Sequence, residues 1–159
     1  MIKDSGTRTD FASGAVRDMG KGKGRFELLP LTELTILEFG SDSVMTYMRT
    51  LKQEIEQNEG FASMKVTIGT ILKYFRDDYY TECPYNTLLR LAVHAEEGAE
   101  KYGDLNWQKG IPLMSYFNSA MRHYCKYRAG WKDEPHEIAF IWNLAALLWT
   151  RYNIKEEEN

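Results

Sequence analysis

The chain has 159 residues, of which 43% are apolar and 27% charged, which fits one globular domain, and no apolar run reaches the ~18 residues of a membrane span. The 20 Lys and Arg against 23 Asp and Glu give a net charge of -3, which disfavours a dedicated duplex DNA binder. Cys83 and Cys125 have neither CxxC spacing nor a second pair, so we expect reduced thiols and no disulfide framework. We also expect a cytoplasmic location, neither secreted nor membrane-bound.

The N-terminal part of the chain is polar and then strongly basic. Residues 1–13 lack periodicity, so we expect a flexible tail. Residues 14–25 hold four glycines and the basic side chains of Arg17, Lys21, Lys23 and Arg25, a composition that suits a phosphate cradle. Their spacing does not match a Walker P-loop. The alternative interpretation of this stretch is a solvated, flexible arm.

Helical periodicity dominates the rest of the sequence. Apolar residues recur at helical spacing, with breaks near Gly40, Gly60, Pro84 and Gly103. The predicted helices cover residues 31–40, 44–55, 61–75, 88–102, 113–128 and 135–152. No convincing strand alternation is present. We therefore predict an all-α fold, a bundle of about five helices.

The predicted helix over residues 88–102 carries a cluster of carboxylates. Leu88, Ala92, Ala95, Ala99 and Tyr102 share one face, which we expect to point inward. Beside it, Leu89 and Val93 continue into Glu96, Glu97 and Glu100. Like charges at this spacing repel, and a divalent cation such as Mg²⁺, which prefers oxygen ligands and phosphates, would offset the repulsion. The alternative is an acidic surface patch without a ligand.

The loop after Gly103 offers groups that suit a purine base. The indole of Trp107 could stack on the base, and the amide of Asn106 could hydrogen-bond to its edge. Alternatively, Trp107 anchors the loop in the core and Asn106 is a turn residue.

Polar residues on the last two predicted helices complete the candidate set. His123 lies on the flank of an apolar face, where a structural hydrogen bond competes with a catalytic role. Glu134, His136 and Glu137 lie at a helix start, which capping and the helix dipole also explain. Asn143 lies between apolar neighbours, and a buried amide there either binds a ligand or crosslinks helices.

Several of these motifs together resemble a known family. They are GAVRD at 14–18, KGRFELLP at 23–30, EEGAEKYGDLNWQKGIP at 96–112, the pair Arg122-His123, and the segment from His136 to Asn143. The sequence resembles the phage dATP/dGTP diphosphohydrolases, the MazZ family, which are related to the all-α MazG-like nucleoside triphosphate pyrophosphohydrolases. The resemblance covers 14–30 and 88–149. It implies one catalytic domain over 14–152 with a helical insertion at about 38–86, and a solvated tail at 153–159.

The resemblance implies hydrolysis of a purine deoxynucleoside triphosphate to its monophosphate and pyrophosphate. A divalent metal would assist, Mg²⁺ first and Mn²⁺ or Co²⁺ as alternatives. In MazG-like relatives an ExxE motif and an ExxD motif on two helices hold the metal. Glu97 and Glu100, with Glu96 beside them, would supply the first set. No ExxD follows, so we assign Glu137 to the second, with Asn143 as the next candidate.

The same resemblance assigns roles to the other candidates. Lys101 and Arg122 would neutralise charge on the triphosphate, and His123 would orient a phosphate or donate a proton. Substrate contacts would come from Arg17, Lys21, Lys23, Arg25, Asn106, Trp107 and Asn143.

The resemblance also implies a cellular setting. We expect a homo-oligomer, dimer or tetramer, in the host cytoplasm, without a membrane or a stable nucleic-acid partner. The dGMP produced could supply 2-aminoadenine genome synthesis. The alternative function is a non-catalytic helical phage protein that binds nucleic acid or a replication partner through the basic residues 14–25.

Overall fold

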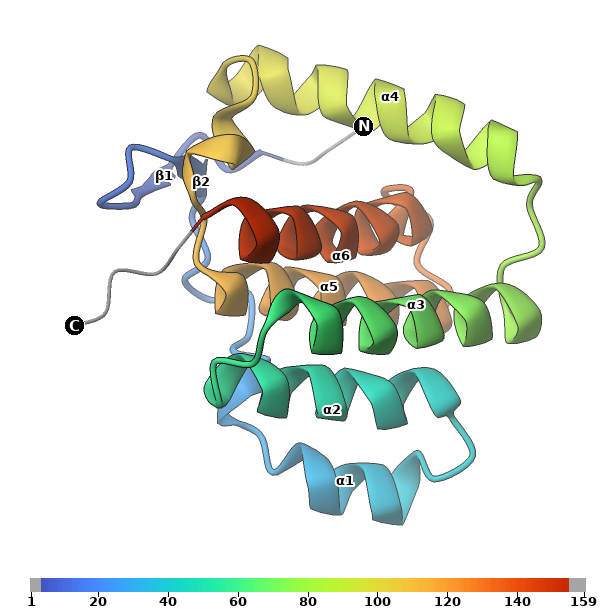
Figure 1. Cartoon of the computed structure of the whole chain (residues 1–159). Coiled ribbons are helices and arrows are strands. Elements are labelled where there is room, and N and C mark those ends of the chain that lie inside the picture. The colour runs from blue at the N-terminus through green and yellow to red at the C-terminus, as the bar shows by residue number, and fades with distance from the viewer. Residues whose placement is uncertain (1–3, 155–159) are drawn as a thin grey trace.

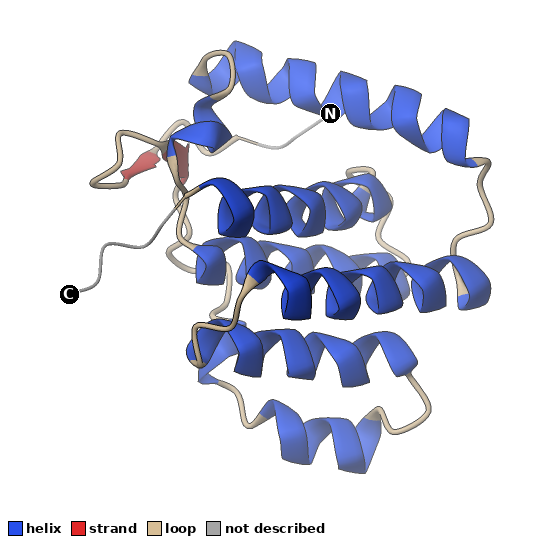
Figure 2. Ribbon diagram, in the orientation of Figure 1, coloured by secondary structure: helices blue, strands red, loops and turns tan. Residues whose placement is uncertain are grey.

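The computed structural model describes residues 4–154, which fold into six α-helices with a small two-stranded ribbon (Figures 1 and 2). In chain order the elements are β1 (Arg8–Asp10), β2 (Val16–Asp18), η1 (Phe26–Leu28), α1 (Leu31–Glu38), α2 (Ser43–Glu56), α3 (Phe61–Asp78), α4 (Pro84–Tyr102), η2 (Asn106–Lys109), α5 (Leu113–Arg128) and α6 (His136–Asn153). The predicted all-α class is confirmed. No described helix is long and apolar enough to cross a membrane, and Cys83 and Cys125 are both free.

The core lies between α5 and α6, which pack closely against each other, with α2 and α3 beside them (Figure 1). Large side chains fill it, among them Phe75, Tyr116, Phe117 and Phe140, none of which is more than 1% exposed. Burying a side chain of this size stabilises the fold by about 1.5–3 kcal/mol. The predicted insertion at 38–86 contains α2 and α3, and their buried residues belong to this same core.

A polar cluster fixes the start of α2 to α5. Asp42 caps α2 by accepting a hydrogen bond from the backbone N–H of Met45. Its carboxylate also accepts hydrogen bonds from the Tyr124 hydroxyl at 2.6 Å and from Arg128 at 2.7 Å. These donors replace the water molecules that the nearly buried carboxylate of Asp42 loses on folding.

The N-terminal segment is a β-ribbon rather than a loose tail. β1 pairs antiparallel with β2, with Thr9 opposite Arg17, and the connecting turn uses Gly14 at φ 86°. The tail predicted over residues 1–13 is therefore corrected for Arg8–Asp10, whereas residues 1–3 lie outside the described part. Strands of three residues are too short to leave an alternating pattern in the sequence. Of the tail predicted at 153–159, Asn153 ends α6 and residues 155–159 lie outside the described part.

Helix α4 runs along one side of the molecule, next to α6 (Figure 1). The expectation that Leu88 and Ala92 point inward is wrong, since both are exposed and Leu88 is 64% exposed. The helix instead turns Leu91 toward the core and places the His94 ring 5.6 Å from that of Trp142 on α6. This rotation decides which carboxylates of α4 reach the interior.

Candidate active site

A cavity of about 1390 Å³ lies where the β-ribbon, the glycine-rich segment, α4, η2, α5 and α6 meet. It brings together the three regions singled out by the sequence: the basic residues 17–25, the end of α4 with the following loop, and the polar residues of α5 and α6. The volume is sufficient for a nucleotide, because pockets for small ligands commonly measure 300–1,000 Å³.

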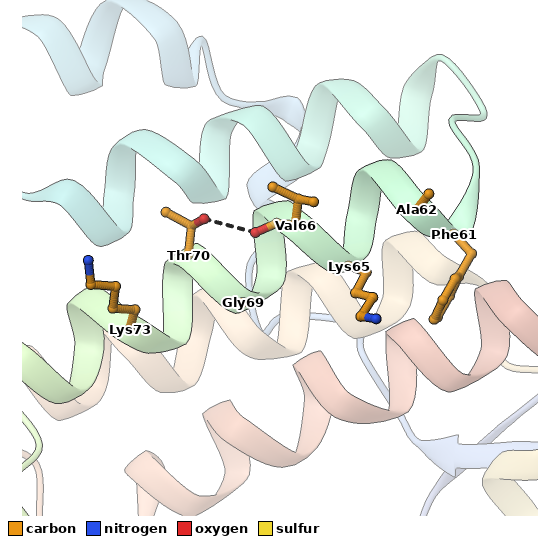
Figure 3. A pocket seen from close by; sticks show the side chains of 7 residues that line it. All are labelled: Phe61, Ala62, Lys65, Val66, Gly69, Thr70 and Lys73. Atoms are coloured by element: carbon orange, nitrogen blue, oxygen red, sulfur yellow. Dashed lines mark hydrogen bonds between the residues drawn. The ribbon is translucent and has the colours of Figure 1, made fainter.

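A second, shallower recess of about 600 Å³ lies on α3 (Figure 3). All seven residues that line it come from that one helix, and the charged ones are Lys65 and Lys73. Without an acid, a base or groups from a second element, this recess lacks the convergent polar groups of a catalytic site.

Arg17 is the central cation of the cavity. Its guanidinium donates to the Asn143 side-chain oxygen at 3.0 Å and to the Ser119 hydroxyl at 3.5 Å, and it lies 5.3 Å from the centre of the Tyr116 ring. Within residues 4–154 no carboxylate lies within ion-pair distance of it. Desolvation by burial lowers its pKa. A partly buried cation held by neutral groups favours an anionic ligand.

Further cations line the same cavity. Arg122 on α5 donates from Nε to the backbone carbonyl of Lys23 at 3.2 Å and so holds the glycine-rich segment in place. Its pKa is also lowered by burial and by Arg17. Lys23 pairs with Asp18 at 2.6 Å and Arg25 with Glu27 at 2.8 Å, whereas Lys21 lines the cavity without a described carboxylate partner. Arg17, Arg122 and Lys21 thus form a wall suited to phosphates.

Asn106 has a structural role that differs from the predicted one. Its side-chain oxygen accepts from the Val16 N–H at 2.9 Å, and its amide nitrogen donates to the Val16 carbonyl at 2.7 Å. The buried amide therefore forms the two backbone hydrogen bonds that a neighbouring strand would otherwise form with Val16 of β2. In this way it positions Arg17, the next residue. Both ends of the amide thus bind the backbone of β2, and the predicted contact of Asn106 with a purine edge stays a prediction.

Trp107 and Asn143 lie in the cavity wall. The Trp107 ring meets Trp142 and Trp149 edge to face, with centroids 5.5 and 4.8 Å apart, so it also anchors η2 against α6. Asn143 is 2% exposed, donates to the Ala139 carbonyl at 2.7 Å and accepts from Arg17. Asn143 is thus a positioning residue for Arg17.

The predicted metal ligands do not gather around one point. Glu96 lines the cavity, but Glu97 and Glu100 do not. Glu137 accepts from Arg90 at 2.6 Å, and Arg90 also binds Glu82, so this carboxylate ties α6 to α4. The four carboxylates therefore do not form a shared cation site in the described chain.

Lys101 and His123, both predicted to be catalytic, have different surroundings. Lys101 does not line the cavity and lies near Asp4. His123 lines the cavity, and its Nδ1 is 2.9 Å from Nδ1 of His136. Burial, together with His136 and Arg122, lowers the pKa of His123 to about 3, so its imidazole is neutral at pH 7.

His123, Glu134 and His136 form a cluster that sequence reasoning did not assemble. Their ligand atoms lie within 4.8 Å of one another, the one such trio of His, Cys, Asp or Glu within residues 4–154. The sequence held part of the signal for this cluster. Glu134 and His136 lie at the same predicted helix start, and His123 belongs to the pair Arg122-His123, but nothing in the spacing brings the two segments together. Capping and the helix dipole explain polar residues at a helix start equally well, so the sequence alone does not single them out.

The fold and the cavity define an all-α protein with a large polar pocket that is lined by both cationic and acidic side chains. The chain matches the family model described as dATP/dGTP diphosphohydrolase, N-terminal, over residues 58–159, which is more than half of its length, and it belongs to that family. The matched part contains α3 to α6 and so extends into the segment predicted as an insertion. Searches of curated proteins and of solved structures found no match.

Proposed function

We propose that the chain hydrolyses dATP and dGTP to the monophosphate and pyrophosphate, with the nucleotide bound in the cavity. The observation that carries this proposal is the buried Arg17 guanidinium, which has only neutral hydrogen-bond partners in the described chain and lies, with Arg122, in a cavity of nucleotide size. Family membership supports it, since the family is named for this activity.

In this proposal the chain acts by holding and neutralising the triphosphate. Arg17 and Arg122 donate to phosphate oxygens where negative charge grows as the bond to pyrophosphate breaks, and Lys21 and Lys23 add charge from the glycine-rich segment. Trp107 offers part of its ring to the base. His123, whose imidazole is neutral, is placed to hold a proton or orient a phosphate.

Divalent metal dependence is part of the proposal, with Mg²⁺, Mn²⁺ or Co²⁺ as the ion. The predicted ligands Glu96, Glu97, Glu100 and Glu137 do not converge in the structure, so we assign no step to an ion held by them. Their role is tested by Glu97→Gln and Glu100→Gln. Loss of pyrophosphate release with an unchanged circular dichroism spectrum would support the carboxylate assignment, and full activity in both variants would remove it.

We also propose a homo-oligomer, dimer or tetramer, in the cytoplasm of a phage-infected cell. An exposed apolar row on α4 favours self-association, because Leu88, Leu89 and Val93 are 64%, 68% and 54% exposed in the single chain. The dGMP produced would be available for 2-aminoadenine genome synthesis if the phage genome uses that base.

The test is a panel of the eight common NTPs and dNTPs, with and without each metal, scored for pyrophosphate and orthophosphate. We expect pyrophosphate from dATP and dGTP that stops when EDTA is added. The alternative, a nucleic-acid binder that uses residues 14–25, predicts DNA binding that falls steeply with salt, ignores EDTA and releases no pyrophosphate.

A further inference from the structure

We propose that His123, Glu134 and His136 bind a first-row transition-metal ion at the inner wall of the cavity. The site is built from the middle of α5 and the start of α6, two helices that pack directly against each other at the core. It is separate from the carboxylates of α4 that the family resemblance suggested.

His136 has the surroundings of a prepared metal ligand. It is fully buried, and its Nε2 lies 2.7 Å from a carboxylate oxygen of Asp133. A carboxylate only accepts, so Nε2 carries the proton and Nδ1 presents its lone pair toward His123. A carboxylate that holds the distal N–H of a histidine is the usual outer partner of histidine metal ligands, because it fixes the tautomer and the ring orientation.

The distance between the two imidazoles also fits an ion. Their Nδ1 atoms are 2.9 Å apart and share one hydrogen. With metal–nitrogen bonds of about 2.0–2.1 Å, two nitrogens at this separation subtend about 90° at the ion. An ion would replace the shared hydrogen if the proton of His123 moved from Nδ1 to Nε2. The imidazole stays neutral in this change of tautomer, so it does not have to lose a proton to bind the ion.

The third ligand and the open positions face the cavity. Glu134 and His123 both line it, whereas His136 lies behind them. Three protein ligands with the remaining positions open are typical of catalytic metal sites. Such an ion would face the same space as Arg17 and Arg122. The idea that this ion acts on the triphosphate rests on the proposed function, whereas the idea that the site binds an ion does not.

The ligand set also predicts which ions bind. Imidazole nitrogens favour Mn²⁺, Co²⁺ or Zn²⁺ over Mg²⁺, which prefers oxygen ligands. An angle near 90° suits Mn²⁺ and Co²⁺ with more than four ligands, and Zn²⁺ would require the rings to separate toward the wider tetrahedral spacing. We therefore expect Co²⁺ or Mn²⁺ to bind in the presence of excess Mg²⁺.

The experiment measures metal binding without nucleotide on the full chain. Co²⁺ is titrated into wild type, His123→Gln, Glu134→Gln and Asp133→Asn and followed by visible absorption, and Mn²⁺ is followed by its paramagnetic resonance. We expect affinity to fall roughly 100-fold or more in His123→Gln and Glu134→Gln, and about 10–100-fold in Asp133→Asn. Circular dichroism verifies folding of each variant, and Glu134→Gln, at a half-buried position, keeps the test valid if the histidine variant fails to fold.

Three further variants test the rival site on α4 and a remote control position. Glu97→Gln and Glu100→Gln should keep Co²⁺ affinity, as should Glu33→Gln, which changes an exposed residue of α1. No Co²⁺ binding by wild type, unchanged affinity in both His123→Gln and Glu134→Gln, or loss confined to the α4 variants would overturn the proposal. The two proposals can fail separately. If wild type binds Co²⁺, the variants His123→Gln and Glu134→Gln do not, and wild type shows no pyrophosphohydrolase activity, the metal site is upheld and only the proposed function is contradicted.

Discussion

At the scale of single residues, the cavity holds the charge of Arg17 at a position where this charge contributes little to the stability of the fold. Arg17 is held by Asn143, Ser119 and the Tyr116 ring, all neutral. Desolvating a cation without a counter-ion costs stability, and functional sites commonly carry such costs. The sequence predicted Arg17 as a phosphate contact from the composition of residues 14–25, but its partners come from α5 and α6 and could not be read from local spacing.

Arg17→Gln should therefore leave the free energy of unfolding within about 1 kcal/mol of the wild-type value, or raise it. The amide of glutamine can still donate to Asn143, whereas the desolvated charge is removed. Urea denaturation without nucleotide measures the difference. A loss of several kcal/mol would show that Arg17 serves the fold rather than a ligand.

Asn106→Ala should destabilise the protein by about 2 kcal/mol, because it removes two hydrogen bonds and leaves the Val16 backbone groups unpaired. Urea denaturation is again the measurement, with Asn106→Asp as the matched control that keeps an acceptor for the Val16 N–H. Unchanged stability combined with altered purine preference would contradict the structural role and favour the predicted base-reading role.

At the scale of elements, helical periodicity located all six helices within a few residues but misjudged the orientation of α4. The apolar sector through Leu88 and Ala92 satisfied the inward pattern, yet the helix turns Leu91 toward the core and places His94 against Trp142 of α6. A helix that packs against one neighbour buries a narrow face, so a second apolar row can remain exposed. Where Glu96, Glu97 and Glu100 point depends on this rotation, which the sequence alone did not determine.

Replacing the exposed row with the double variant Leu88→Gln/Leu89→Gln should convert an oligomer into monomers without loss of cooperative unfolding. The reason is that apolar area at an interface supplies much of its association energy. Size-exclusion chromatography with light scattering measures the mass, and Leu37→Gln on α1, at a leucine 76% exposed, is the matched control. A wild-type protein that is already monomeric would contradict the proposed role of α4.

At the scale of the whole molecule, the cavity exists only when distant segments meet. The β-ribbon contributes Arg17, α4 contributes Glu96, and α5 and α6 contribute Arg122 and Asn143. The sequence motifs indicated which segments belong together. The pairing of His123 with His136, in contrast, depends on how α5 and α6 pack, which residue spacing does not specify.

The most direct test of the account is calorimetric titration of a dGTP analogue that cannot release pyrophosphate, compared between wild type and the variants Arg17→Gln and Arg122→Gln. Each arginine is expected to contribute a charge-assisted hydrogen bond to phosphate, so affinity should fall about 10–100-fold in each variant. Arg151→Gln, which changes an arginine bound to Asn58 and outside the cavity, should bind as wild type. Equal affinity in all four proteins would contradict the claim that the cavity binds the triphosphate.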